Sequence, residues 1–190
     1  QVSSALPEYD LVDSWLAAAG LAVEAPVHLM IAGNEPVCDR CEVEAIERVQ
    51  VTTGIDEDWA RAYGLVFGAL PVQVARTQAY GRMLTAFGDR ALGASLQIDG
   101  EVVGVGFGVL DDGWLGIFGM GTAAAHRRRG IATDVVWALR AAARERGTTR
   151  AYLQVETDNA GAIHLYEGLG FEVSHGYYYR SEGSDPEQGC

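Results

Sequence analysis

The stretch that decides the fold is His126-Arg127-Arg128-Arg129-Gly130-Ile131-Ala132-Thr133. An apolar strand-like segment, residues 114–120, runs into it, and a helical segment from residue 130 to about residue 146 follows it. The first amides of a helix have no acceptor within the helix and carry partial positive charge, so this junction suits an anion. Gly130 allows close approach of a ligand, and the three arginines supply forked donors that suit phosphate. Taken alone, these residues could also form an ordinary exposed basic turn.

A second motif lies downstream, at residues 159–171, where the sequence reads NAGAIHLYEGLGF. The spacing Arg127-x-x-Gly130-x-Ala132 resembles the R/Q-x-x-G-x-G/A pyrophosphate loop of the GNAT N-acetyltransferases. Residues 159–171 resemble the N-x-x-A-x-x-L-Y-x-x-x-G-F signature of the same family. The two motifs follow the family's order with a strand-like segment between them. The resemblance is strong over residues 91–180 and extends more weakly back to Cys41.

The resemblance implies an α/β (α+β) fold, the GNAT fold, in which a mixed central sheet is splayed at the cofactor site and flanked by helices. We expect a GNAT acetyltransferase domain at residues 41–182, an N-terminal extension at residues 1–40 and a flexible tail at residues 183–190. Residues 14–31 read as a helix followed by a strand, a form seen at the end of GNAT domains. The extension could therefore be the remnant of a degenerate first GNAT half, or a plain N-terminal decoration.

The composition excludes several kinds of chemistry. All 14 basic residues are arginine, so the chain lacks the lysine that a Walker A loop or a Schiff-base enzyme needs. The net charge of −12 argues against a nucleic-acid partner, which needs a basic face. An acidic surface would favour a cationic amine as substrate, although it could equally serve solubility. We expect a monomer or a homodimer.

No apolar run among the 190 residues is long enough to span a membrane, and the first residues lack the basic-then-apolar layout of a signal peptide. The sequence therefore predicts a cytoplasmic protein without a membrane partner. Its cysteines are Cys38, Cys41 and Cys190, and the C-x-x-C pair has no second pair that would complete a zinc site. Because a strand-like run at residues 43–52 follows this pair, we expect a loop with two incidental thiols, and no metal.

Hydrophobic patterning predicts further elements. We expect a short helix at residues 15–19, a strand at residues 23–31 with Pro26 at an edge or bulge, helices at residues 56–63 and 72–87, and strands at residues 92–98, 102–110, 114–122, 151–155 and 171–180. Five large side chains on the two middle helices could wall an acceptor cleft or belong to the core: Trp59, Tyr63, Phe67, Tyr80 and Met83. Alternate glycines at residues 104–108 leave one strand face bare, which makes room for another element or for a ligand.

The resemblance also implies which residues bind acetyl-CoA. Backbone groups before the loop would pair with pantetheine and the thioester: Met120, Gly121 and Thr122. The loop and the first helical turn would hold the pyrophosphate: Arg127, Arg128, Arg129, Gly130, Ile131, Ala132 and Thr133. Asn159 resembles the asparagine that contacts the cofactor arm, although it could simply cap a helix.

Tyr166 resembles the family tyrosine that protonates the departing thiolate, and its alternative is a core tyrosine. Gln154 occupies the position of the glutamate base found in ribosomal-protein-type members, and it cannot take a proton. Strand alternation puts Glu156 on the same face, so Glu156 or a water chain could replace the base. His164 and His175 are weaker candidates.

The reading that these motifs favour is an acetyl-CoA-dependent N-acetyltransferase that acts on a primary amine of a small molecule or peptide. The alternative is a non-catalytic acyl-CoA-binding module with a regulatory or interaction role, which Gln154 and the unusual N-terminal segment would suit. A redox or zinc module built on Cys38 and Cys41 lacks the further ligands that it would need.

Overall fold

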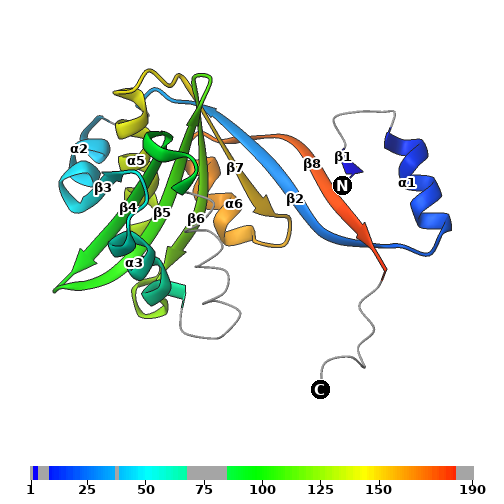
Figure 1. Cartoon of the computed structure of the whole chain (residues 1–190), viewed down its shortest axis with the longest axis horizontal. Helices are drawn as coiled ribbons and strands as arrows, with labels where there is room; N and C mark the ends of the chain where they lie inside the picture. The colour runs from blue at the N-terminus through cyan, green and yellow to red at the C-terminus, as the bar shows by residue number, and fades with distance from the viewer. Residues whose placement is uncertain (1, 4–8, 37–38, 68–84, 183–190) are drawn as a thin grey trace. The chain divides into compact units, whose positions relative to one another are not determined.

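The computed structural model describes residues 2–3, 9–36, 39–67 and 85–182 (Figure 1). The chain divides into two compact units. The larger unit is Ala32–Tyr152, and the smaller unit combines Gln1–Ile31 with Leu153–Cys190. Two strands, β2 (Ala22–Gly33) and β7 (Arg150–Glu156), contribute residues to both units.

An antiparallel meander forms the sheet of the larger unit. Four strands pair in chain order: β3 (Val49–Thr53), β4 (Ala91–Ile98), β5 (Glu101–Asp111) and β6 (Trp114–Thr122). Asp99-Gly100 and Asp112-Gly113 join the last three strands, and all four residues have φ between 43° and 83°. Positive φ at both central residues defines the two-residue hairpin turn that matches strand twist. The three predicted strands and their turns are therefore confirmed.

Two helices cover opposite faces of this meander (Figure 1), namely α3 (Glu57–Phe67) and α5 (Ile131–Arg144). Along β5, Val105 and Phe107 point into the core beneath α3. The glycines that alternate with them, at positions 104, 106 and 108, face α5, and a Cβ placed on Gly106 would lie 2.9 Å from Val135 Cγ1. The bare strand face is thus filled by a helix, which settles the choice between another element and a ligand.

The aromatic residues of α3 belong to the core. Asp56 begins the helix, because its Oδ1 accepts a hydrogen bond from the Trp59 amide at 2.7 Å. Trp59 and Tyr63 are buried, and the Trp59 ring contacts the Phe107 ring edge-on at 5.7 Å between centroids. Trp59 Nε1 also donates to the Ala94 carbonyl at 3.1 Å. The predicted second helix with Tyr80 and Met83 lies outside the described residues, apart from residues 85–87.

The predicted strand over residues 43–52 is wrong in its first part. The chain forms a helix, α2 (Asp39–Arg48), and only then the strand β3. Within α2 the buried residues with a described side chain are Glu42 and Ala45, spaced three residues apart, which is the period of a helix and not of a strand. Cys41 therefore lies in the first turn of a helix. The expectation of two incidental thiols rested on a strand directly after the C-x-x-C pair, and that reason does not hold. Cys38 lies outside the described residues.

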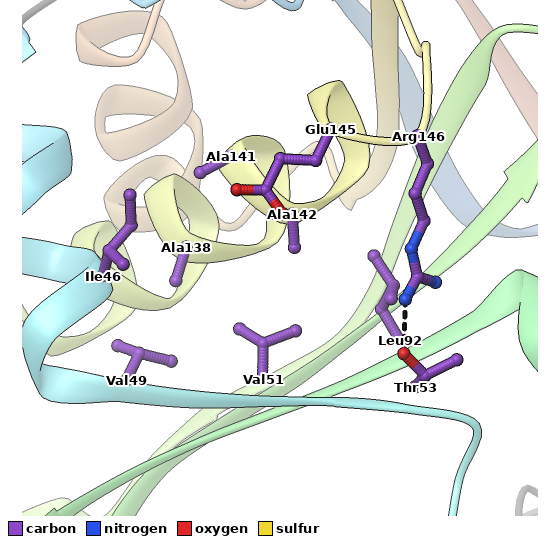
Figure 2. Close-up of a pocket in the computed structure, with 10 residues that line it drawn as sticks. All are labelled: Ile46, Val49, Val51, Thr53, Leu92, Ala138, Ala141, Ala142, Glu145 and Arg146. Atoms are coloured by element: carbon purple, nitrogen blue, oxygen red, sulfur yellow. Dashed lines mark hydrogen bonds between the residues drawn. The ribbon is translucent and has the colours of Figure 1, made fainter.

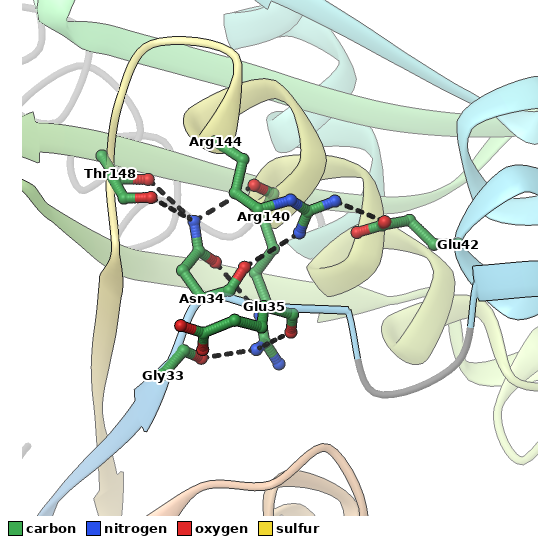
Figure 3. Close-up of polar contacts among 7 residues, drawn as sticks. All are labelled: Gly33, Asn34, Glu35, Glu42, Arg140, Arg144 and Thr148. Carbon is green, nitrogen blue, oxygen red and sulfur yellow. Dashed lines mark hydrogen bonds and ion pairs between the residues drawn. The ribbon is translucent and has the colours of Figure 1, made fainter.

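A buried arginine ties the chain before α2 to α5 (Figure 3). Arg140 is 1% exposed, and its guanidinium donates to the carbonyls of Gly33 at 2.6 Å and Glu35 at 3.1 Å and to Asn34 Oδ1 at 3.2 Å. Asn34 in turn donates to Thr148 Oγ1 at 2.7 Å. Burial lowers the pKa of Arg140, with the nearby Arg144 as the second cause.

The smaller unit is built around β8 (Glu172–Ser181), which pairs antiparallel with β1 (Val2–Ser3) and with β2. The β2–β8 register shifts between Glu24 and Val27, so the predicted bulge at Pro26 is confirmed. Helix α1 (Tyr9–Ala18) begins earlier than predicted and is held by Asp13, whose Oδ1 and Oδ2 accept from Arg180 at 2.6 and 3.0 Å. This hydrogen bonding lowers the pKa of Asp13. Helix α6 (Ala160–Gly168) precedes β8.

Two glycine substitutions should change stability in opposite directions. Gly106→Ala should lower the free energy of unfolding by about 1–3 kcal/mol, because the new methyl group would enter a filled core, 2.5 Å from Met120 Sδ. Gly64→Ala should raise it by about 0.5–1 kcal/mol, because Gly64 lies within α3 with nothing within 4 Å and alanine favours helix. Urea unfolding measures both values. A neutral Gly106→Ala would show that α5 does not pack against β5 in this way.

The Arg140 network should be a second stabilising feature. Asn34→Ala should lower the free energy of unfolding by about 2–4 kcal/mol, because it leaves a buried guanidinium with one partner fewer. Arg61→Ala is the matched control, since the Arg61–Asp58 pair is exposed and such pairs contribute at most about 1 kcal/mol. Equal losses in the two variants, measured by the same unfolding experiment, would contradict a special role for Asn34.

Candidate functional site

The end of β6 carries a β-bulge. Phe118 pairs with Phe107 and Gly121 pairs with Val105, so one strand has one residue more than the other between the two pairs. Gly119 takes the strained position at φ 58°, where a Cβ would lie 2.6 Å from Phe107 Cε1. A bulge re-aims the backbone that follows it. Here it redirects three partly buried residues that the sequence singled out: Met120, Gly121 and Thr122.

The loop after β6 ends in an open helix start. Arg128 has φ 62°, and Gly130, the N-cap of α5, has φ 79°. Among the described residues, the amides of residues 128–133 find no hydrogen-bond acceptor, whereas the next amide, that of Asp134, donates to the Gly130 carbonyl at 3.0 Å. Nothing lies within 4 Å of the position that a Cβ on Gly130 would take. This arrangement of free amides at a helix N-terminus is suited to a phosphate group.

The loop arginines add uncompensated positive charge. Arg127, Arg128 and Arg129 are exposed, and none lies within 4.0 Å of a carboxylate in the described part of the chain. Arg127 Nε donates to the Thr122 carbonyl at 3.4 Å, and Arg129 lies 3.2 Å from His126 Nδ1. These contacts hold the side chains near the loop without neutralising them. The loop therefore combines backbone donors with forked cationic donors.

In the smaller unit, Asn159 is the N-cap of α6, and its Oδ1 accepts a hydrogen bond from the Ala162 amide at 3.1 Å. The side chain is exposed. The predicted cap is thus confirmed. The amide nitrogen of this side chain has no hydrogen-bond partner among the described residues, so it could also donate to a ligand.

Tyr166 lies on α6 and is 8% exposed. Its ring meets that of Phe171 edge-on, with centroids 6.0 Å apart. Burial raises the pKa of Tyr166 to about 12. The phenol therefore stays protonated at neutral pH and can act as a proton donor rather than as a base.

Gln154 and Glu156 alternate with buried residues on β7 and are both exposed. Gln154 Oε1 accepts a hydrogen bond from the Tyr177 hydroxyl at 2.8 Å, so Gln154 already has a partner. Burial raises the pKa of Tyr177, which keeps this donor protonated. The sequence did not single out Tyr177, whose side chain is buried. His164 is exposed, and His175 Nδ1 lies 3.3 Å from Ser174 Oγ.

The predicted residues fall into two sets. The β6 end and the loop belong to the larger unit, and Glu156, Asn159 and Tyr166 belong to the smaller unit. Within the larger unit, Phe67 of α3 lies beside the β6 end, since a Cβ on Gly121 would be 2.6 Å from Phe67 Cε2. Two aromatic residues of α3 therefore reach this part of β6, Phe67 at Gly121 and Tyr63 at Gly119.

A cavity of about 340 Å³ lies elsewhere in the larger unit, between α2, β3 and α5 (Figure 2). Its walls are mostly aliphatic, and Arg146 at its edge donates to Thr53 Oγ1. It contains none of the predicted site residues. Among the described residues, no three His, Cys, Asp or Glu side chains gather as a metal site would require. No described helix combines the length and apolar character needed to cross a bilayer.

Comparisons with known proteins agree with the motifs. The model of the acetyltransferase (GNAT) family matches residues 53–171. The uncharacterized N-acetyltransferase YobR of Bacillus subtilis (strain 168) is 35% identical over 69 residues, which make up 36% of this chain and 28% of YobR. The chain therefore matches little more than a quarter of the length of this relative.

Two solved structures share the fold. One contains a GCN5-related glucosamine N-acetyltransferase region of a fungal multi-domain GH3 beta-N-acetylglucosaminidase, with a TM-score of 0.69, 16% identity, and coverage of 93% of this chain and 23% of that chain. The other is AAC(6')-Iy in complex with the bisubstrate analogue CoA-S-monomethyl-acetylneamine. Its TM-score is 0.53 and its identity is 16%, and the match covers 65% of this chain and 90% of that chain. The predicted α/β fold with flanking helices is confirmed.

The family match covers more than half of the chain and contains both motifs, the loop before α5 and the segment from Asn159 to Phe171. The chain therefore belongs to the acetyltransferase (GNAT) family.

Proposed function

We propose that this protein is an acetyl-CoA-dependent N-acetyltransferase that acetylates a primary amine of a small molecule or peptide. The observation that carries the proposal is the open start of α5, where the amides of residues 128–133 lack acceptors among the described residues. The family match supports acetyl transfer as the class of reaction. We further propose residues 41–182 as the acetyltransferase domain and residues 1–40 as an extension of it.

The loop fits the pyrophosphate of CoA on physical grounds. Six neighbouring amides and three arginine side chains supply donors and positive charge, and the space above Gly130 is clear. In this proposal the pyrophosphate binds residues 127–133, and the backbone of Met120, Gly121 and Thr122 binds pantetheine. Asn159 would contact the cofactor arm through its free amide nitrogen. A fold neighbour binds a CoA bisubstrate analogue, which is consistent with this choice of ligand.

When bound, acetyl-CoA supplies an activated acetyl group for transfer to nitrogen. The bulged backbone at Met120 would donate a hydrogen bond to the thioester oxygen, where negative charge develops during attack. Tyr166 Oη would donate its proton to the departing sulfur, and its raised pKa keeps that proton in place at neutral pH. Electrostatic stabilisation requires donors that are positioned before the ligand binds, and the burial of Tyr166 would limit the movement of its side chain.

The amine must lose a proton, and we assign the role of proton acceptor to Glu156, which would act directly or through a water molecule. Gln154 cannot serve, because an amide does not take up a proton at neutral pH and its oxygen already accepts from Tyr177. Glu156 is exposed on the same face of β7, two residues further along. The net charge of −12 would draw a cationic amine toward the protein.

The occupied Gln154 also favours a second candidate, a module that binds acyl-CoA without transferring the acetyl group. Release of free thiol from acetyl-CoA, measured across a panel of amines, separates the two functions. Turnover with any amine supports the enzyme. Tight CoA binding without turnover supports the module.

Gly130→Asp should weaken CoA binding by about 10-fold or more, because a carboxylate at the open helix start repels phosphate. It should hardly change the affinity for pantetheine, which lacks the pyrophosphate. Gly147→Asp is the matched control, since Gly147 also has positive φ and open space but lies beyond the other end of α5. Calorimetry with both ligands gives the answer, and equal losses for CoA and pantetheine would sink the phosphate assignment.

Tyr166→Phe should lower kcat by about 10²–10³-fold and leave CoA affinity nearly unchanged, because it removes one proton donor and keeps the ring. The pKa of about 12 places the loss of this proton above the range in which the protein is assayed. The pH–rate profiles of the parent and the variant should therefore have the same shape up to about pH 10, since a phenol is protonated below its pKa. An unchanged rate, with chemistry shown to be rate-limiting, would return Tyr166 to a purely structural role.

A further inference from the structure

The open end of α5 has a carboxylate beside it. Asp134 lies in the first turn of α5, immediately after the free amides. Its side chain is 16% exposed, and burial raises its pKa, while Arg48 acts in the opposite direction. A negative charge at this place opposes the binding of a diphosphate by the same helix end.

Arg48 compensates this charge. It is the last residue of α2, and its NH1 lies 2.5 Å from Asp134 Oδ2. The ion pair is partly buried, so salt screens it less than it screens a fully exposed pair. Arg48 lies before the segment that the family model matches, residues 53–171.

Helix α2 is fixed in a position that maintains this pair. At its other end, Glu42 accepts a hydrogen bond from Arg144 in the last turn of α5 (Figure 3), so the two helices run antiparallel. Ala45, between Glu42 and Arg48, is fully buried. The Arg140 network holds the chain just before α2. Contacts at both ends and in the middle therefore keep Arg48 on Asp134.

We propose that Arg48 is a positioning residue for the cofactor: by neutralising Asp134, it keeps the start of α5 positive enough to hold the CoA pyrophosphate. This inference rests on the proposed function. It assigns a role in cofactor binding to α2, a helix that makes no contribution to either family motif. Arg48 acts through Asp134 and needs no contact with the cofactor.

Calorimetric titration with CoA and with pantetheine tests this role. Arg48→Met should weaken CoA binding by about 3–10-fold at low ionic strength, because it exposes the ligand to an uncompensated carboxylate. Arg48→Lys should stay within about 2-fold of the parent, since it retains the charge. Pantetheine affinity should not change. The loss for CoA should shrink as salt is added.

Asp134→Asn supplies the decisive comparison. The double variant Arg48→Met with Asp134→Asn should regain the CoA affinity that Arg48→Met loses, and Asp134→Asn alone should bind CoA at least as tightly as the parent. Arg40→Met is the matched control. Arg40 lies on the same helix, and its substitution removes the same charge from an exposed pair with Glu44. This control should bind CoA like the parent.

Each other outcome overturns the inference. Failure of Asp134→Asn to restore affinity would mean that Arg48 contacts the phosphates itself or merely supports folding. An equal loss in Arg40→Met would point to net charge alone. If the Arg48→Met variant does not fold, Asp134→Asn still tests the inference. Weaker CoA binding by Asp134→Asn than by the parent protein would refute the role of Arg48 in neutralising Asp134. Absence of CoA binding in the parent protein would instead overturn the proposed function.

Discussion

The packing of α5 directly on the backbone of β5 is the constraint on which the candidate site depends. Gly104, Gly106 and Gly108 have no side chains, so Ile131, Val135 and Leu139 settle against the strand itself. Ile131 is the first residue of α5 and is 2% exposed. The helix start is thus anchored by core packing, and its free amides hold a fixed place without any ligand. A binding site built in this way needs little reorganisation when an anion arrives.

Three residues near the end of β6 and the start of α5 have left-handed backbone conformations. Gly119 and Gly130 have positive φ, and so does Arg128, for which that conformation costs about 1 kcal/mol or more. At Gly119 the Phe107 and Tyr63 rings occupy the space that a side chain would need, so the bulge requires glycine there. The aromatic core under α3 therefore shapes the end of β6 from one face, while α5 positions the loop from the other. The aromatic core and α5 therefore both pack against the segment that contains the end of β6 and the loop of the first motif.

The sequence predicted the elements that local patterns control. The meander, its two turns, the α5 start at Gly130 and the Asn159 cap follow from glycines, caps and alternation near each position. The predicted strand over residues 43–52 was wrong in its first part, because tertiary packing decides between the repeat of a strand and that of a helix there. Val43 and Ala45 alternate as in a strand, yet Glu42 and Ala45 are the buried residues, and the segment forms a helix against α5. The burial of Arg140 could not be predicted, because nothing nearby in the sequence shows that Asn34 lies beside it. The candidate site residues come from motif spacing, whereas Tyr177 and Arg48 contact partners that are distant in the chain, Gln154 and Asp134.

Because the chain has no lysine, arginine supplies all of its permanently cationic side chains. The groups that each guanidinium contacts determine whether it pairs with a carboxylate, bonds to neutral oxygens or stays available for an anion. Among the described residues, six arginines pair with carboxylates, whereas the buried Arg140 donates to neutral oxygens of Gly33, Asn34 and Glu35, a setting in which a lysine would tend to lose its proton. The loop arginines meet no carboxylate among the described residues, although acidic residues outnumber basic ones by 26 to 14. Positive potential is therefore local rather than general. Such a distribution disfavours extended polyanions and concentrates cationic donors at the start of α5, where the proposed pyrophosphate would bind.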